Sequence, residues 1–340
     1  MSFAVGVDLG GTNLRIAAVS EQGELLEKAV TETKLTLGRD AVMAEMAAAV
    51  RELSAKFGKW RRFLGVGVGV PGIIDQRTGM LRESPNLPGW NDYPVREEIE
   101  RRLASAVFLE NDANCAALGE AWLGAARHAA HMCMITLGTG IGGGLICDGR
   151  VWQGMTGMAG EIGHINVDPD GPKCGCGSYG CVEQFASATA VLRMAREAIA
   201  AGKAPALAEA QQHGRELTAE IVYDLAKRGD TAAQEIFRKA GRALGILLAD
   251  LVNALNMQMY VIGGGVSSAW DVFAPAMFEE LRRRSYVYAA TAPEDISAAL
   301  DAAAFPPEEP RSAGARTVIT RARLGSDAGL FGAARLPMPA

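Results

Sequence analysis

Hydrophobic positions along the chain recur with two different periods. Residues 3–9 form a short apolar run that ends in glycines, which predicts a buried strand. Between Asp40 and Phe57 apolar residues return every three or four positions, the period of a helix with one buried face. Further strands are predicted at 14–20, 63–70, 106–109, 132–137, 145–147, 259–262 and 317–320, and further helices at 95–103, 113–123, 186–201, 218–228, 231–256, 270–284 and 326–334. Strands and helices that alternate in this way indicate an α/β protein.

One local arrangement occurs twice in this pattern. A strand, a glycine-rich loop and a second strand occupy residues 3–20, and the same series of elements returns at 132–147. A repeat of this kind predicts a duplicated core with two similar halves around a cleft. We place the domain boundary near Asp112. A small α/β domain then comprises residues 1–112 and a returning C-terminal helix at about 321–340, and a large α/β domain comprises residues 113–320.

Composition narrows the range of partners. The chain has 34 Lys and Arg against 39 Asp and Glu, so its net charge is −5, and basic residues occur only in short runs. This balance argues against a nucleic-acid or anionic-membrane surface. No apolar run reaches the roughly 18–20 residues that a membrane span needs, and the sequence opens directly on a strand without a basic leader. We therefore expect a cytoplasmic protein.

The two glycine loops are candidates for binding phosphate. A glycine loop after a strand exposes backbone N–H groups that can hold phosphate oxygens, and a neighbouring carboxylate can hold the Mg²⁺ that accompanies a nucleotide. The first loop offers Asp8, Gly10, Gly11 and Thr12, and the second offers Thr136, Gly138, Thr139 and Gly140. Either loop alone is also consistent with a plain hairpin turn, and neither has the lysine of a Walker loop. Two such loops together indicate a nucleotide that lies between two domains.

Three of the six cysteines fall within eight residues and predict a metal site. Cys174, Cys176 and Cys181 follow His164 in a polar, glycine-rich stretch without an apolar core in which to bury thiols. One imidazole and three thiolates are a suitable ligand set for tetrahedral Zn²⁺. Because these four side chains leave no open coordination position, the predicted zinc is structural and fixes the loop at 161–183. The alternative is three reduced cysteines and a solvated histidine.

Carboxylates and amides in turn-forming stretches are candidates for binding a polyol such as a sugar. They are Asn86, Asn111, Asp112, Glu161 and Glu183. Planar carboxylate and amide groups make the paired hydrogen bonds that sugar hydroxyls need, and one carboxylate can act as a base. Each residue also has a structural alternative. Asn111 or Asp112 can cap the helix that follows, and Glu161 or Glu183 can be a solvated charge.

At these residues the sequence resembles the ROK family of bacterial sugar kinases and sugar-responsive repressors. The resemblance extends from about residue 5 to about residue 334. Residues 8–15 and 137–144 match two phosphate motifs that many sugar kinases share. The segments 161–164 and 174–183 match the sugar and zinc signature of the family, which is far more specific. Within the family the sequence looks most like the glucokinases.

The resemblance implies an actin-like ATPase fold of the ribonuclease H-like type, and an ATP-dependent hexokinase that phosphorylates the C6 hydroxyl of glucose. Asp112 would be the catalytic base, and His164 would present one ring nitrogen to zinc and the other to the sugar. The residues that would bind sugar are Asn86, Asn111, Asp112, Glu161, His164 and Glu183. The residues that would bind ATP with Mg²⁺ are Asp8, Gly10, Gly11, Thr12, Asn13, Thr136, Gly138, Thr139, Gly140, Gly263, Gly264 and Gly265. The zinc ligands would be His164, Cys174, Cys176 and Cys181. The resemblance also implies a homodimer or a higher homo-oligomer.

Several alternatives stay open within this resemblance. The hexose can instead be N-acetylglucosamine, N-acetylmannosamine, mannose, allose or fructose, and the phosphoryl donor can be polyphosphate. A sugar-responsive repressor would carry a DNA-binding helix-turn-helix ahead of the kinase-like body, for which a first strand at Phe3 leaves no room. A sugar sensor without catalysis is disfavoured because Asp8, Asp112 and both glycine loops are present. The segment 289–314 is richer in Pro and Glu than a compact connection needs, and we expect a surface loop there.

Overall fold

The computed structural model describes residues 1–212, 216–294, 296–300 and 316–339, which form two compact units. Unit 1 comprises Met1–Met134, Gly144–Gly160 and Arg323–Ala340, and unit 2 comprises Ile135–Gly143 and Glu161–Ala322. The sequence predicted the boundary near Asp112. Contacts in the structure group residues 113–134 with unit 1, because the helix that begins at Asp112 packs against the helix at 328–335.

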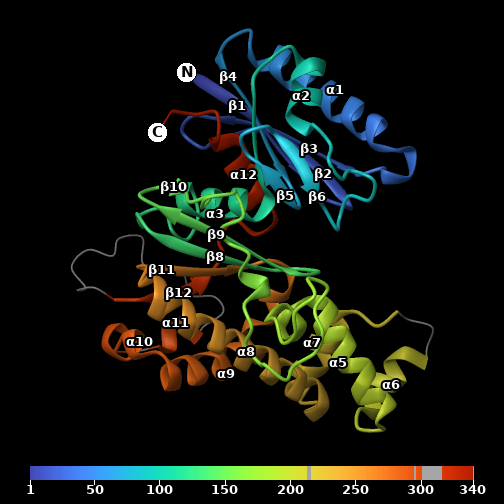
Figure 1. Ribbon diagram of the computed structural model, residues 1–340, viewed down its shortest axis with the longest axis vertical. Helices are drawn as coiled ribbons and strands as arrows, with labels where there is room; N and C mark the ends of the chain where they lie inside the picture. Colours follow the sequence, from blue (N-terminus) through green and yellow to red (C-terminus); the bar gives the residue numbers. More distant parts are fainter. Residues whose placement is uncertain (213–215, 295, 301–315, 340) are drawn as a thin grey trace. The chain divides into compact units, whose positions relative to one another are not determined.

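Unit 1 is built on a five-stranded sheet with the strand order β3-β2-β1-β4-β7 (Figure 1). The strands are β1 (Ser2–Leu9), β2 (Asn13–Ser20), β3 (Leu25–Glu32), β4 (Arg62–Val70) and β7 (Val107–Asn111). Neighbours among β1, β2 and β3 are antiparallel, whereas β4 is parallel to both β1 and β7. The three parallel strands therefore end at one edge of the sheet, where Asp8 pairs in register with Gly69 and Gly69 pairs with Glu110.

Helices cover both faces of this sheet because side chains alternate along its strands. Large apolar residues of β1 point into a core formed with α1 (Arg39–Phe57) and α2 (Val95–Leu103). Smaller residues of β1 and β2 point to the other face, where they pack against α12 (Ala328–Arg335). α3 (Asp112–Trp122) packs against α12 in turn. A short hairpin of β5 (Ile73–Asp75) and β6 (Met80–Glu83) follows β4.

Glycines allow α12 to pack closely against the first sheet and against α3. A Cβ atom built on Gly6 of β1 would overlap the backbone carbonyl of Leu330, and one on Gly67 of β4 would overlap that of Ala333. On the helix itself, a Cβ on Gly332 would overlap a carbonyl oxygen of α3. The backbones of α12, α3 and the two strands therefore approach more closely than any side chain would allow.

The second sheet repeats the strand order of the first. Its order is β10-β9-β8-β11-β12, and β8 and β9 contribute residues to both units. The strands are β8 (Met132–Leu137), β9 (Ile141–Cys147), β10 (Arg150–Val151), β11 (Met259–Gly263) and β12 (Val318–Arg321). β9 and β10 are antiparallel and β11 and β12 are parallel, as are the corresponding strands of the first sheet. The duplicated core that the sequence predicted is present in this topology.

Helices make up most of unit 2 (Figure 1). They are α4 (Glu183–Ala186), α5 (Ala188–Ala200), α6 (Pro205–Gln212), α7 (Ala219–Lys227), α8 (Thr231–Leu255), α9 (Trp270–Arg284), α10 (Tyr286–Thr291) and α11 (Ser297–Leu300). α8 and α9 pack closely, because Gly241 and Gly245 of α8 lie directly against carbonyl groups of α9. The surface loop expected at 289–314 falls partly on residues 295 and 301–315, which lie outside the described residues.

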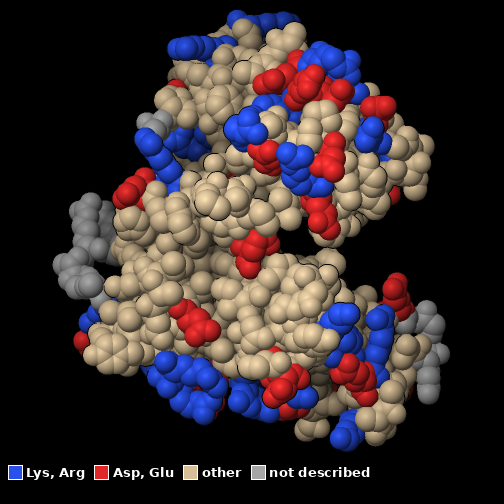
Figure 2. Space-filling view, viewed as in Figure 1, with Lys and Arg blue, Asp and Glu red and all other residues tan. Residues whose placement is uncertain are grey.

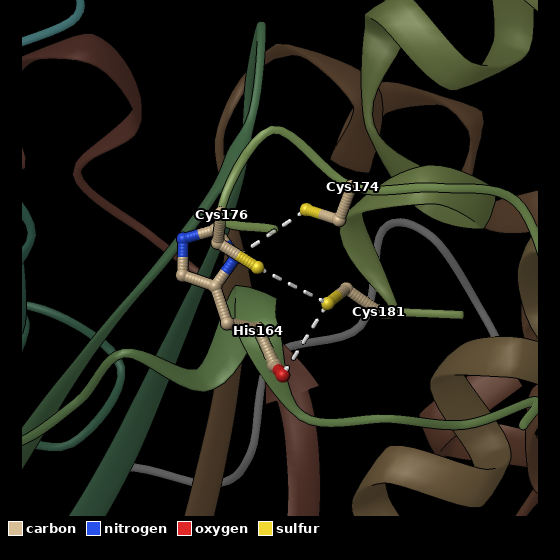
Figure 3. Close-up of side chains that lie close together, drawn as sticks. All are labelled: His164, Cys174, Cys176 and Cys181. Carbon is tan, nitrogen blue, oxygen red and sulfur yellow. Dashed lines mark hydrogen bonds between the residues drawn. The ribbon is translucent and has the colours of Figure 1, made fainter. Parts of the chain in front are cut away.

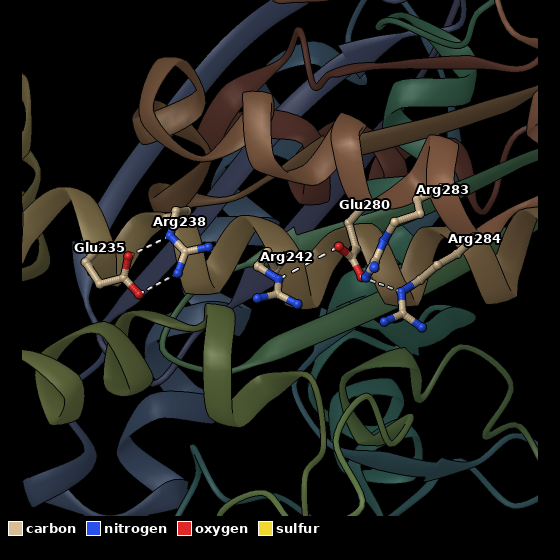
Figure 4. A network of polar contacts seen from close by, with 6 residues as sticks. All are labelled: Glu235, Arg238, Arg242, Glu280, Arg283 and Arg284. Atoms are coloured by element: carbon tan, nitrogen blue, oxygen red, sulfur yellow. Dashed lines mark hydrogen bonds and ion pairs between the residues drawn. The ribbon is translucent and has the colours of Figure 1, made fainter.

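A buried carboxylate joins α8 to α9 at the surface of unit 2 (Figure 4). The side chain of Glu280 is 6% exposed and receives hydrogen bonds from Arg283, at 2.6 Å, and from Arg284. Arg242 of α8 lies 3.8 Å from the second carboxylate oxygen. Burial alone would raise the pKa of Glu280, but the hydrogen bonds and charges of Arg283 and Arg284 outweigh it and hold that pKa below its ordinary value.

The surface carries charges of both signs. On the face drawn in Figure 2, basic side chains of the described residues lie beside acidic ones. This mixture agrees with the small net charge of the sequence. Among the described helices, none combines the length and the apolar character that crossing a bilayer requires.

Candidate functional site

The first glycine loop joins β1 to β2 and is held in place by its carbonyl groups. The N–H of Gly10 donates to the carbonyl oxygen of Asn13 at 2.9 Å. Thr33 donates its hydroxyl to the carbonyl of Gly10 and its N–H to the carbonyl of Thr12, each at 2.8 Å. No described residue accepts a hydrogen bond from the N–H of Gly11 or Thr12. The loop is thus a hairpin turn, and it also presents the N–H groups that a phosphate needs.

The second glycine loop, between β8 and β9, is held in the same way within unit 2. The N–H of Gly138 donates to the carbonyl of Gly140 at 2.9 Å. Ala188 donates its N–H to the carbonyl of Gly138, and Thr189 donates its hydroxyl to the carbonyl of Thr139, each at 2.8 Å. No described residue accepts from the N–H of Thr139 or Gly140. Thr136 lies near the end of β8, immediately before this loop.

Asp8 stands at the end of β1, beside the first loop. Its carboxylate accepts a hydrogen bond from Arg15 of β2 at 3.1 Å. Burial raises the pKa of Asp8 above its ordinary value, against the lowering effect of Arg15, and the charge of Asp327 adds to the rise. Ionised Asp8 is therefore a buried anion that would gain from a nearby cation.

Asn86 lies against the first glycine loop. A Cβ built on Gly11 would lie 2.7 Å from the backbone oxygen of Asn86 and 3.5 Å from its Cβ. The loop can therefore approach the segment of Asn86 only because residue 11 is a glycine. This contact places a predicted sugar-binding residue next to a predicted phosphate-binding loop.

Asn111, rather than Asp112, caps α3. The Asn111 side-chain oxygen accepts from the N–H groups of Ala113 and Asn114, at 2.9 and 3.2 Å, and its nitrogen donates to the carbonyl of Gly72 at 3.2 Å. Both lone pairs of the oxygen are used, so what Asn111 can still offer a ligand is its second amide hydrogen. Asp112 is the first residue of the helix, where the helix dipole favours a negative charge.

Glu161, His164 and Glu183 lie in unit 2. Glu161 precedes the short helix η2 (Ile162–His164), and its carboxylate is 3.9 Å from Nε2 of His164. Glu183 begins α4, and one of its oxygens accepts the N–H of Ile141 at 2.9 Å, at the end of the second glycine loop. The carboxylate of Glu183 therefore contacts a predicted phosphate loop as well as belonging to the predicted sugar site.

His164, Cys174, Cys176 and Cys181 come together as the sequence predicted (Figure 3). Their ligand atoms all lie within 4.8 Å of one another. The sulfurs of Cys176 and Cys181 are 3.7 Å apart, and Nδ1 of His164 is 3.6 Å from the sulfur of Cys174. Tetrahedral zinc with ordinary bond lengths gives edges of about 3.8 Å between two sulfurs and about 3.6 Å between sulfur and nitrogen. The donor set and its spacing therefore fit zinc.

Gly263, Gly264 and Gly265 follow β11 directly. Gly264 has a φ of +86°, which favours glycine, and a Cβ there would overlap the carbonyl of Leu137, just before the second glycine loop. Among the described residues, no heavy atom lies within 4 Å of a Cβ built on Gly265. Gly264 thus packs directly before the second loop, and Gly265 faces open space among the described residues.

The predicted site residues fall into two groups. Asp8, the loop at 10–13, Asn86, Asn111 and Asp112 belong to unit 1, and the others belong to unit 2. Two further residues support the site and escaped the sequence analysis. Thr33 holds the first loop, and Glu110, which is 2% exposed, accepts hydrogen bonds around the start of α3. In the sequence, Glu110 could have been recognised as a carboxylate at the end of an apolar strand.

Comparisons with known proteins agree with this geometry. The ROK family model matches residues 4–304. The chain is 38% identical over 284 residues to a glucokinase of Thermotoga maritima, covering 84% of this chain and 87% of that protein. It is 41% identical over 270 residues to a glucokinase of Halalkalibacterium halodurans, covering 78% and 81%.

A solved structure of a ROK family glucokinase from Streptomyces griseus, in complex with glucose and AMPPNP, has a similar fold. The TM-score is 0.75 at 32% sequence identity, and the match covers 98% of this chain and 99% of the other. Together with the repeated strand order, this likeness confirms the predicted actin-like ATPase class of fold.

Proposed function

The chain belongs to the ROK family, and we propose that it is an ATP-dependent sugar kinase that phosphorylates the C6 hydroxyl of a hexose, with glucose as the main substrate. The observation that carries this proposal is the similarity, over nearly the whole chain, to a glucokinase whose structure holds glucose and an ATP analogue. The local geometry supports it, because both glycine loops present N–H groups and carry a carboxylate beside them.

We assign the sugar to carboxylate and amide groups from both units. Glu161, Glu183 and Nε2 of His164 would bind hydroxyl groups from unit 2, and Asn86 and Asn111 would do so from unit 1. Asn111 contributes a single donor, since its oxygen caps α3. Asp112 would orient the C6 hydroxyl and accept its proton as the bond from that oxygen to the γ-phosphorus forms and the bond to the β-phosphate oxygen breaks.

The phosphates would be held by the N–H groups of Gly11, Thr12, Thr139 and Gly140. Phosphoryl transfer has a loose transition state, so positioning and neutralisation of charge supply most of the rate enhancement. Asp8 fits a Mg²⁺ site, because its largely buried carboxylate stands at the end of β1 beside the first glycine loop, and carboxylate oxygens are preferred ligands of Mg²⁺. Bound there, Mg²⁺ would neutralise charge on the phosphates of ATP.

We also propose that His164, Cys174, Cys176 and Cys181 hold a structural zinc ion. A closed set of four protein ligands is typical of zinc that stabilises a fold. Nδ1 of His164 faces the cysteines, which leaves Nε2 on the side of Glu161. Zinc bound at Nδ1 would therefore fix the tautomer in which Nε2 carries the proton and donates it in a hydrogen bond.

The test is an assay of ADP release with Mg²⁺ and ATP across glucose, N-acetylglucosamine, N-acetylmannosamine, mannose, allose and fructose. Asp112→Asn keeps the size of the side chain and removes its basicity, so we expect it to lower kcat by about 10²- to 10⁴-fold. Asp148→Asn is a matched control, because Asp148 lies in an exposed turn with a positive φ that asparagine tolerates.

A rate that is highest with glucose and falls in Asp112→Asn but not in Asp148→Asn supports the proposal. Preference for another of the six sugars keeps the kinase and changes its substrate. Formation of sugar phosphate with polyphosphate in place of ATP, measured on the sugar product itself, changes the donor. No turnover with any sugar and either donor refutes the proposed activity and points to a sugar-responsive regulator.

A further inference from the structure

Glu110 is a buried carboxylate for which the proposed mechanism has no use. It lies at the end of β7, directly before Asn111 and Asp112, and is 2% exposed. Among the described residues, no lysine, arginine or histidine forms an ion pair with it. A buried carboxylate needs several hydrogen bonds in such a place, because burial without partners is costly.

Four donors meet this need, and all of them belong to unit 1. Oε1 accepts from the N–H of Asn111 at 2.9 Å, from the side chain of Asn114 at 3.0 Å and from that of Gln76 at 3.1 Å. Oε2 accepts from the side chain of Gln153 at 2.6 Å. The last distance is in the short range of hydrogen bonds to a charged acceptor.

These four bonds join parts of unit 1 that are far apart in the sequence. Asn111 and Asn114 belong to the cap and first turn of α3, on which Asp112 stands. Gln76 belongs to the turn between β5 and β6, and Gln153 follows β10. The hydrogen bonds to the two carboxylate oxygens of Glu110 therefore fix the backbone around Asp112 relative to the turn at Gln76 and to the segment after β10.

Asn114 shows how firmly this arrangement is held. Its side chain is 1% exposed, its nitrogen donates to Glu110, and its oxygen has no hydrogen-bond partner among the described residues. Turning the amide over would place its oxygen against the carboxylate, which is repulsive. The orientation that leaves a buried acceptor unpaired is thus the one that serves Glu110.

We propose that Glu110 is a positioning residue that holds the first turn of α3, and with it Asp112, in the geometry that phosphoryl transfer requires. This inference rests on the proposed function in that Asp112 is taken as the base. Among the described residues, the hydrogen bonds of Glu110 go to Gln76, Asn111, Asn114 and Gln153 and to neither glycine loop, so we expect its effect on the step that Asp112 serves rather than on ATP binding.

The first test compares Glu110→Gln with the wild type in kcat and in KM for ATP. The amide of glutamine keeps the size of the side chain, but only its oxygen can accept hydrogen bonds, because its nitrogen is a donor. We expect kcat to fall by about 10- to 100-fold, the effect of a displacement near 1 Å in a reacting group, with KM for ATP unchanged. Gln153→Leu removes one of the four bonds from a half-buried position, and we expect a smaller fall in kcat.

Glu120→Gln is the matched control. Glu120 is another fully buried carboxylate, at the end of α3 opposite Asp112, and the donors to it among the described residues are backbone N–H groups. We expect it to lower stability without lowering kcat. Equal losses of kcat in Glu110→Gln and Glu120→Gln would overturn the proposal, because they would reflect stability alone.

Hydrogen exchange supplies a readout that does not depend on turnover. In Glu110→Gln the amides of residues 111–116 should exchange faster than in the wild type, while those of β1 and β2 stay protected. If the wild type phosphorylates no hexose, the proposed function fails and exchange at 111–116 still decides whether Glu110 holds this turn. If the wild type is active and Glu110→Gln retains kcat or normal exchange, the positioning role is wrong and the proposed function stands.

Discussion

Replacing Glu120 by Gln should destabilise unit 1 strongly. The carboxylate is 0% exposed and lies in the last turn of α3. It accepts the N–H of Ala125 at 2.7 Å, that of Arg323 at 2.9 and 3.0 Å, and that of Leu324 at 2.7 Å. It therefore ties the strand-to-helix connection ahead of α12 to the end of α3.

The size of the effect follows from these bonds. A glutamine oxygen in the place of Oε1 keeps the N–H groups of Arg323 and Leu324, but the amide nitrogen then faces the N–H of Ala125 as a second donor. A hydrogen bond to a charged group contributes about 1.5–3 kcal/mol, and one to a neutral group about 1 kcal/mol. One bond lost and two weakened give a cost of about 3 kcal/mol. In a unit of this size that lowers Tm by about 6–12 °C.

The assay is thermal unfolding followed by calorimetry, with hydrogen exchange at 323–335 to assign the transition to unit 1. The control is Glu235→Gln, because Glu235 pairs with Arg238 on the exposed side of α8, at 2.6 Å, where a salt bridge contributes less than about 1 kcal/mol (Figure 4). If Glu120→Gln lowers Tm no more than Glu235→Gln does, the N–H groups of Ala125, Arg323 and Leu324 do not stabilise unit 1 through Glu120 as we argue.

Two further predictions concern unit 2. Arg283 and Arg284 hold the pKa of Glu280 in the folded protein below the ordinary value of 4.5. The contribution of Glu280 to stability is therefore complete above pH 4.5 and is lost as the pH falls through the lower pKa of the folded state. Glu280→Gln should therefore cost on the order of 1 kcal/mol at pH 7, and urea unfolding should show this difference shrinking below pH 4.5; a constant difference would contradict it. Cys176→Ser should reduce bound zinc, measured by elemental analysis, from about one ion per chain, whereas Cys147→Ser, outside the cluster, should not.

Much of the fold could be predicted because the buried elements have clear periodicity. The strand at 3–9 and the helix at 231–256 were visible in the apolar pattern, and both exist within one or two residues. β3 was missed because it is an edge strand with mostly exposed side chains, so its sequence lacks a strong pattern. The two short strands of the hairpin at 73–83 were missed because they are too brief to show a period.

The site was predictable where its chemistry depends on residues close in sequence. The cysteine spacing predicted a cluster, and the glycine runs predicted two loops of the same construction. The choice between Asn111 and Asp112 as the cap depended on backbone angles, which only the structure supplies. Glu110 was missed because its partners, such as Gln76 and Gln153, are brought to it by the fold from distant parts of the chain.

The close packing of α12 on the glycines of the first sheet has a consequence for the order in which the two units can fold during synthesis. β1 is translated well before α12, yet one face of β1 packs against this helix, which is encoded more than 300 residues later. All strands and helices of unit 2 described here are translated between them. Translation proceeds at about 5–20 residues per second, so the face of the first sheet that carries small residues stays uncovered for tens of seconds, until α12 has been made. All of unit 2 is therefore available to fold while unit 1 still lacks α12 and this face of its sheet is uncovered.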